Sequence, residues 1–215
     1  KMQLKILHLL ALSLCLSTTS TFAQNSDLCF KRQVGKQFHY ADSNNTKIKI
    51  ENTTFEQKSA IAVISESGGI LFKDIFDLTG RRLLANLMYA LEDNDQSPSE
   101  IISEISYHSP YPQFPTNMSI GQKFQIHLNP IHRHYNIESP TENTILNMEF
   151  KGFETLDFIM QDENLLSLKQ VCHFSTQTDV GFFDEWYAEG YGLVQSIQKS
   201  VDGVIMSIQS IGQTP

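Results

Sequence analysis

Short runs of β-branched and aromatic residues, each closed by turn-forming residues, restrict the fold of this 215-residue chain more than any other feature. Lys47–Glu51 alternates between polar residues and isoleucine, and the run Ser59–Glu66 ends at Ser67-Gly68-Gly69. Alternation with a period of two places one set of side chains on a single face of a strand. The sequence therefore predicts many short strands.

Further strands are expected at Phe38–Ala41, Ile70–Leu78, Ile101–Tyr107, Phe124–Leu128, Thr144–Phe153, Leu168–Ser175 and Phe182–Tyr187. Arg82–Asp93 fits a strand or a helix equally well, because its leucines recur at helical spacing between strand-like neighbours. Polar loops are expected at Asp93–Ser99 and between Pro130 and Pro140. The three prolines of Ser109–Pro115 exclude regular structure, so this segment is expected to cross the domain in extended form.

The end of the chain has the clearest local signal. The last two predicted strands, Leu193–Val201 and Val204–Ile211, flank Asp202-Gly203, a pair typical of two-residue type I′ turns. Pairing across this turn places Ile197 opposite Ile208. The predicted fold class is all-β, with a minor helix allowed, built as an antiparallel and largely up-and-down curved sheet or a partly closed barrel.

The first 23 residues have the pattern of a cleavable secretion signal. Two lysines precede an apolar run of about 11 residues, and small residues occupy the −3 and −1 positions at Thr21 and Ala23. This run is shorter than the ~20 residues that span a bilayer. The alternatives are a buried helix and a lipoprotein signal at Cys15, against which the bulky Leu14 argues. We expect cleavage after Ala23, one β-rich domain over residues 24–215, and a periplasmic or secreted protein.

The cysteines and the charge fit this interpretation. Cleavage would remove Cys15 and leave Cys29 and Cys172 in an oxidising compartment, so we predict a disulfide between them, with two free buried thiols as the alternative. The signal has two basic residues and no acidic ones, so its removal would change the formal net charge from −8 to −10. This acidic balance argues against nucleic acid and anionic membrane surfaces as partners.

The usual catalytic and cofactor motifs are missing from the sequence. There is no Gly-x-Ser-x-Gly, His-Glu-x-x-His, phosphate-binding loop or Cys-x-x-Cys. Neutral imidazoles bind zinc or copper, so His127, His132 and His134 are the candidate ligand- or metal-binding residues, although the prolines around them favour a solvated loop. We predict no catalytic residue and no cofactor.

Two segments resemble a known group of proteins. Tyr111–Pro115 is followed by Gly121–Phe124, and Trp186–Val194 reads Trp-Tyr-Ala-Glu-Gly-Tyr-Gly-Leu-Val. Over roughly Pro110–Ile211 the chain resembles uncharacterised bacterial periplasmic β-rich proteins. These have a Phe-Pro…Gly-x-x-Phe/Trp segment and a Trp-Tyr-Ala-x-Gly-x-Gly-Leu-Val motif. The resemblance implies a β-rich envelope domain and no established reaction.

The residues of the second motif have a structural interpretation of their own. Trp186 and Tyr187 belong to a strand, and Trp186 is the single tryptophan of the chain and is expected to fill core volume. Gly190 and Gly192 allow a strand to kink or to approach another backbone closely. The motif is therefore predicted to form a corner in a curved sheet. The neighbouring acidic residues could be paired carboxylates for acid–base chemistry, but without a pocket that raises a pKa they are expected to face solvent: Asp184, Glu185 and Glu189.

Two hypotheses about function follow. The first is a non-catalytic envelope module whose curved sheet binds a lipid, a glycan or a protein partner, with some of the 14 phenylalanines lining a cavity. The second is a periplasmic hydrolase or metal-binding protein that uses the three histidines with a carboxylate.

Overall fold

A computed structural model describes residues 25–41, 46–91, 98–135, 137–139, 141–213 and 215. The predicted secretion signal, Cys15 and most of the predicted loop Asp93–Ser99 lie outside these residues. Eight of the described strands form a first sheet with the order β1-β2-β3-β4-β5-β6-β8-β9. Their bounds are β1 Gln37–His39, β2 Lys47–Phe55, β3 Lys58–Ser67, β4 Ile70–Phe76, β5 Leu83–Leu91, β6 Pro98–Tyr107, β8 Pro130–His134 and β9 Ile137–Ser139.

The other six strands form a second sheet with the order β14-β13-β12-β11-β10-β7. Their bounds are β7 Lys123–Leu128, β10 Thr144–Ile159, β11 Leu165–Thr178, β12 Gly181–Ala188, β13 Gly192–Ser200 and β14 Ile205–Ser210. Within the described residues the helical content is one 3-10 turn, η1 Ser26–Phe30, and no helix there is long and apolar enough to cross a membrane.

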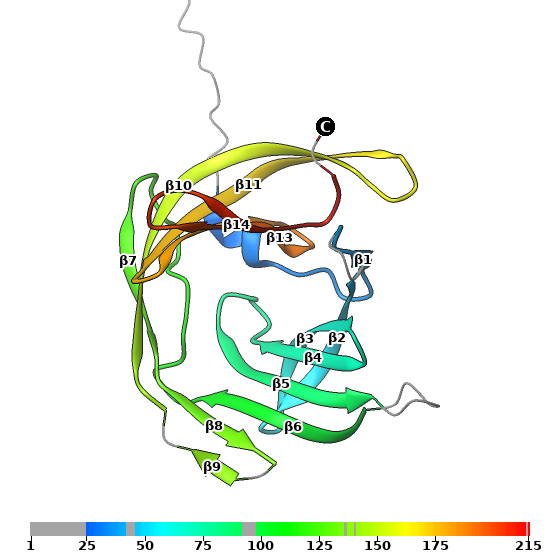
Figure 1. Cartoon of the computed structure of the whole chain (residues 1–215), viewed down its shortest axis with the longest axis vertical. Coiled ribbons are helices and arrows are strands. Elements are labelled where there is room, and N and C mark those ends of the chain that lie inside the picture. The colour runs from blue at the N-terminus through cyan, green and yellow to red at the C-terminus, as the bar shows by residue number, and fades with distance from the viewer. Residues whose placement is uncertain (1–24, 42–45, 92–97, 136, 140, 214) are drawn as a thin grey trace, which may run out of the picture.

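The predicted all-β class is confirmed. Neighbouring strands pair antiparallel throughout both sheets, and most follow each other along the chain. Figure 1 shows the two sheets one above the other, joined where the chain passes from β7 to β8. Neither sheet closes into a barrel over the described residues, because β1 and β9 are the edges of one and β14 and β7 are the edges of the other.

The segment that fitted a strand and a helix equally is strand β5. Its backbone pairs on one side with β4 and on the other with β6, so both rows of its peptide groups are used in the sheet. These non-local hydrogen bonds outweigh the helical preference of leucine and methionine.

The prediction of a polar loop between Pro130 and Pro140 was wrong, because this stretch contains β8 and β9. Ser106 of β6 pairs with Ile131, and Arg133 of β8 pairs with both Glu104 and Glu138. Arg133 also forms ion pairs with these two glutamates at 3.2 and 3.4 Å. Cross-strand charge pairing therefore supports strands in a segment whose composition is typical of a loop.

The last hairpin also differs from its prediction. Ile197 does pair with Ile208, as expected. The turn, however, is longer than two residues: the amide of Gly203 donates to the carbonyl of Ser200, and Gly203 alone in the turn has a positive φ, 84°. A bulge then places Lys199 opposite Ile205. Asp202-Gly203 thus forms a turn that ends in a left-handed glycine instead of a type I′ turn.

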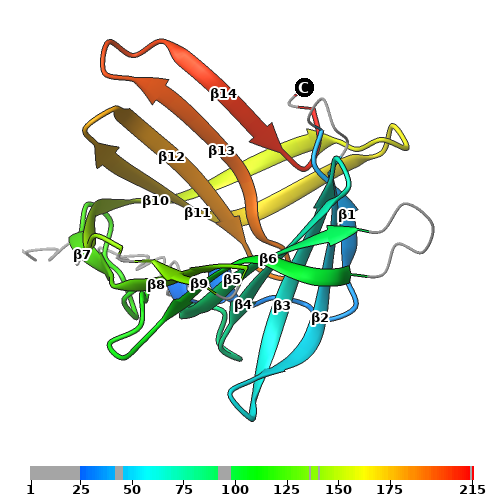
Figure 2. The same ribbon diagram turned by 60° about the horizontal axis from the view of Figure 1, so that its bottom comes forward.

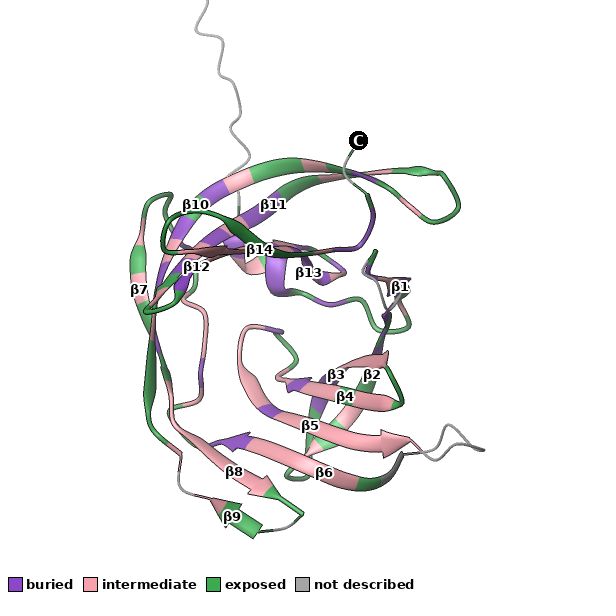
Figure 3. Ribbon diagram, in the orientation of Figure 1, coloured by how far each residue is buried: buried purple, intermediate pink, exposed green. Residues whose placement is uncertain are grey.

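The main core lies between the sheets. Figure 3 shows buried residues along β10, β11 and β13 and on η1, with shorter buried stretches in β2–β6. One cluster joins residues of both sheets: Phe38, Ile48, Ile50 and Ile61 with Phe158, Val171, Trp186 and Val194. A second cluster is rich in aromatic rings and centres on Phe30, Phe150 and Phe174.

The β13–β14 hairpin extends away from the first sheet, as Figure 2 shows. This position explains why several apolar residues of the hairpin are exposed: Val201, Val204, Ile205, Met206 and Ile208.

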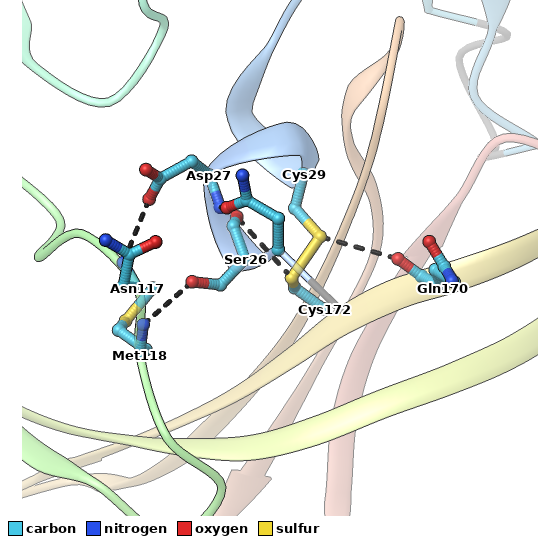
Figure 4. Close-up of a disulfide and its surroundings, with 8 residues drawn as sticks. Ser26, Asp27, Cys29, Asn117, Met118, Gln170 and Cys172 are labelled. Carbon is cyan, nitrogen blue, oxygen red and sulfur yellow. Dashed lines mark hydrogen bonds between the residues drawn. A yellow bond between two sulfur atoms is a disulfide. The ribbon is translucent and has the colours of Figure 1, made fainter. Parts of the chain in front are cut away.

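The predicted disulfide is present in the structure. Cys29 of η1 is bonded to Cys172 of β11, with 5.9 Å between the Cα atoms, and both residues are buried. Figure 4 shows the surroundings: the Ser26 hydroxyl accepts a hydrogen bond from the Met118 amide at 2.9 Å, and Asp27 accepts one from the Asn117 amide at 3.2 Å. The N-terminal segment is thereby fixed to the second sheet and to the segment before β7.

Candidate ligand-binding cleft between the two sheets

A cleft of about 310 Å³ lies between the two sheets, a volume at the lower end of the range for small-molecule sites. Its wall from the second sheet includes side chains of four strands: Ile126, Leu128, Leu146, Met148, Thr176, Thr178, Phe183, Glu185 and Tyr187. The opposite wall comes from β4, the β4–β5 turn, β5 and the proline-rich segment: Phe76, Arg81, Leu83, Pro112, Gln113 and Phe114.

Strand register explains why the first of these walls is continuous. Leu146 of β10 pairs with Ile126 of β7, and Thr176 of β11 pairs with Phe183 of β12. Directly paired residues point to the same face of a sheet, so these side chains share one surface. Glu185 follows Phe183 by two residues and therefore joins the same surface.

The proline-rich segment forms part of the other wall. As predicted, it is irregular and extended: the Leu83 amide donates to the carbonyl of Pro112, and the Phe114 amide donates to the carbonyl of Arg81. The ring of Phe114 stacks on Phe30, with 4.3 Å between the ring centroids. The segment thus connects the β4–β5 turn with the aromatic cluster of the second sheet.

Glu185 is the acidic residue of this cleft. The Tyr187 hydroxyl donates a hydrogen bond to Glu185 Oε2 over 3.4 Å, which is long for a contact between two oxygens. Burial raises the pKa of the Glu185 carboxyl above its ordinary value, because the charged form loses hydration. Glu185 is half-buried in the cleft instead of facing open solvent as expected, whereas Glu189 of the following turn is exposed.

Arg32 is a buried cation behind the cleft. Its Nη1 donates to the carbonyls of Phe30 and Gly80 at 3.0 and 2.6 Å, and its guanidinium lies 3.6 Å from the centroid of the Phe76 ring. Burial lowers the pKa of the Arg32 guanidinium from its ordinary value to about 10. Arg32 still carries a proton at neutral pH and joins the N-terminal segment to the β4–β5 turn. The Nε atom of Arg32 is buried without a hydrogen-bond partner.

The glycines of the Trp186–Val194 motif lie beside this N-terminal segment. The Gly190 amide donates to the carbonyl of Lys31 at 2.7 Å, and the Gly190 carbonyl accepts from the Gln33 amide at 3.0 Å. Gly192 has a φ of 81°, and a Cβ atom there would lie 3.1 Å from Arg32 Nε. The motif therefore forms the turn from β12 to β13 and accommodates a second backbone segment and the Arg32 side chain.

A polar cluster that the sequence did not reveal lies on the opposite face of the same strands. His173 Nδ1 lies 2.7 Å from Glu154, and its Nε2 lies 3.4 Å from Asp184. Lys199 Nζ lies 2.7 Å from Asp184, and the ring of Trp186 stacks on His173 with its Nε1 donating to Glu154. Asp184 is therefore 13% exposed rather than solvent-facing. These contacts depend on the register of four strands.

The three candidate histidines do not converge. His127 is exposed on β7 of the second sheet, whereas His132 and His134 lie on β8 of the first sheet. His132 Nε2 is 2.8 Å from the Ser103 hydroxyl, and the ring of His134 packs against Tyr135. Within the described residues, no three His, Cys, Asp or Glu side chains form a group that could hold a metal ion. The three histidines lie on strands β7 and β8 instead of in the expected solvated loop.

A second hollow on the first sheet has a different character. It measures about 440 Å³ and its wall includes the charged side chains of Lys47, Lys49, Glu51, Glu66 and Lys73. Lys49 and Glu51 already pair there at 2.8 Å. The cleft between the sheets combines mostly apolar walls with one desolvated carboxyl group, which makes it the better candidate for a ligand site.

Sequence reasoning did not identify the residues of the cleft. The alternation Phe183-Asp184-Glu185-Trp186-Tyr187 placed Glu185 on one face with two aromatic residues, and this was the available signal. Nothing in the sequence showed that this face would be covered by Phe76 and Leu83, which are about 100 residues earlier in the chain.

Comparisons with known proteins add little. No protein-family model matches the sequence, and no curated protein matches it. A crystal structure from Bacteroides fragilis, described as a candidate exported protein with a YmcC-like fold, superposes with a TM-score of 0.42 and 13% sequence identity. The alignment covers 86% of this chain and 98% of that one. A similarity this distant assigns neither an activity nor a ligand.

Proposed function

We propose that the protein is a non-catalytic binding module of the bacterial cell envelope that holds a small apolar ligand in the cleft between its sheets. The observation that supports this most is the cleft itself, with Ile126, Leu146 and Met148 in one wall and Phe76 and Leu83 in the other. Binding would remove apolar surface of both the ligand and the cleft wall from water. This burial would contribute roughly 25 cal/mol per Å² to the binding free energy.

The location in the periplasm is part of the proposal. It rests on the signal pattern over residues 1–23 and on the resemblance of two segments to motifs of bacterial periplasmic proteins. The disulfide between Cys29 and Cys172 suits an oxidising compartment.

A dye-binding experiment tests the proposed site. Leu146 and Ile145 are neighbours on β10; Leu146 lines the cleft, whereas Ile145 is 49% exposed. Leu146→Trp should fill the cleft and strongly reduce the binding of Nile red to the purified protein. Ile145→Trp adds the same ring outside the cleft and should leave dye binding unchanged.

A third variant serves as the control for dye that binds at the exposed β13–β14 hairpin. Met206 is 60% exposed, so Met206→Lys should remove dye from that surface without changing the cleft. The proposal is wrong if Leu146→Trp binds Nile red as wild type does, or if Met206→Lys abolishes binding. Native mass spectrometry of protein purified without detergent would show whether a lipid is bound. If the true ligand is a protein partner, that partner would bind to protein that carries no lipid.

A further inference from the structure

The Glu185 carboxyl group has one hydrogen-bond partner among the described residues and lies in a mostly apolar wall that also includes Thr176 and Thr178. Its hydrogen bond from the Tyr187 hydroxyl is 3.4 Å long. None of the ion pairs formed by the described residues involves Glu185. A desolvated carboxylate accepts several hydrogen bonds and gains most from a charged or strongly polar donor.

Arg81 lines the wall opposite Glu185 and Arg32 lies behind the cleft, and both donate to backbone carbonyls. Arg81 Nη1 donates to the carbonyl of Phe114 at 3.2 Å, and Arg32 Nη1 donates to two carbonyl groups behind the cleft. Neither guanidinium lies within 4.0 Å of Glu185. Because Glu185 lines the cleft, a donor that comes from outside the protein can reach its carboxyl group.

We propose that the ligand of the cleft is a single-tailed amphiphile whose polar end is a hydrogen-bond donor, an amine before a hydroxyl, seated against Glu185. This inference rests on the proposed function. The apolar tail packs against Leu128, Leu146 and Met148, and the donor completes the hydrogen bonding of the carboxylate. A fatty acid with its carboxylate seated against Glu185 is disfavoured, because the two groups would carry like charge.

Competition between three amphiphiles with one tail length tests this inference. Dodecylamine, dodecanol and dodecanoate are each titrated as competitors of Nile red at neutral pH, below the micellar concentration or solubility limit of each. The amine should bind at least roughly tenfold more tightly than the carboxylate, because a hydrogen bond to a charged group contributes ~1.5 kcal/mol or more. The alcohol should fall between them.

Two substitutions then locate this preference. Glu185→Gln keeps the shape of the side chain and removes its charge, so the preference for the amine should fall at least several-fold while Nile red still binds. Glu189→Gln removes an exposed carboxylate outside the cleft and should leave the order of affinities unchanged. Glu185→Leu should remove the preference of the alcohol over the carboxylate as well.

The outcomes separate this inference from the proposed function. If Nile red binds and is lost in Leu146→Trp, but dodecanoate competes as well as dodecylamine, the cleft is a ligand site and the donor inference is wrong. The inference is equally overturned if Glu185→Gln retains the full preference for the amine. If neither the dye nor any amphiphile binds, the proposed function itself fails.

Discussion

At the scale of single residues, Glu185 and Arg32 are ionisable groups whose environment in the fold differs from that in water. Burial raises the pKa of Glu185 above its ordinary value of 4.5, so the folded protein binds this proton more tightly than the unfolded chain does. The tighter binding of this proton stabilises the folded protein. That stabilisation is fully present below pH 4.5 and is lost as the pH rises through the folded-state pKa of Glu185. Ionised Glu185 thus opposes folding at neutral pH.

Glu185→Gln is therefore expected to melt at a higher temperature than wild type at neutral pH. The difference should shrink as the pH falls toward 4.5, because wild-type Glu185 then becomes neutral as well. Differential scanning calorimetry over a pH series measures this, with Glu189→Gln as the exposed control. A pH-independent difference in melting temperature would contradict the assignment of Glu185 as a desolvated carboxyl group.

Arg32 gives a second prediction at this scale. Arg32→Leu keeps apolar volume near Phe76 but leaves the carbonyls of Phe30 and Gly80 without their donor. The free energy of unfolding should fall by about 2 kcal/mol or more. Urea denaturation of this variant is compared with that of Lys31→Ala, whose side chain is exposed. Equal stability of the two variants would show that Arg32 does not join these segments.

At the scale of elements, the turn from β12 to β13 is specified by glycine. Gly192 and Gly203 have similar positive φ values, 81° and 84°, but Arg32 crowds Gly192 whereas Gly203 has open space around it. Both alanine variants incur the cost of a left-handed backbone, about 1–2 kcal/mol. Gly192→Ala should be the less stable of the two in thermal denaturation. The reverse order would argue against the close approach of Arg32.

The sequence predicted most strands and little of the site, for identifiable reasons. Alternation in β2 marks a strand because one face of it packs on the core, whereas the apolar run of β3 marks a strand that is buried on both faces at Ala60–Ala62. β8 has weak alternation and is stabilised by its pairing with β6, which no local pattern reveals. The cleft wall around Glu185 required the packing of the two sheets, which depends on contacts between residues far apart in the sequence.

At the scale of the whole molecule, the disulfide joins residues 143 positions apart. In the chain-entropy model such a link restricts the unfolded chain by about 5 kcal/mol at most. Replacing Cys29 and Cys172 together by serine should lower the free energy of unfolding by roughly 2–5 kcal/mol, as measured by urea denaturation. Wild type treated with reductant should match the variant, and unchanged stability would contradict a structural role for the bond.

The two-sheet architecture places the candidate site where both layers contribute walls. One sheet supplies Glu185 and Leu146, and the other supplies Phe76 and Leu83. A ligand held there would contact both layers at once and should therefore stabilise the fold as a whole.

The most direct measurement is a crystal structure of the protein saturated with dodecylamine. The account predicts the tail between the sheets, along Leu146 and Met148, with the nitrogen within about 3 Å of the Glu185 carboxylate. An empty cleft, with the amphiphile bound at the β13–β14 hairpin or elsewhere on the surface, would contradict it.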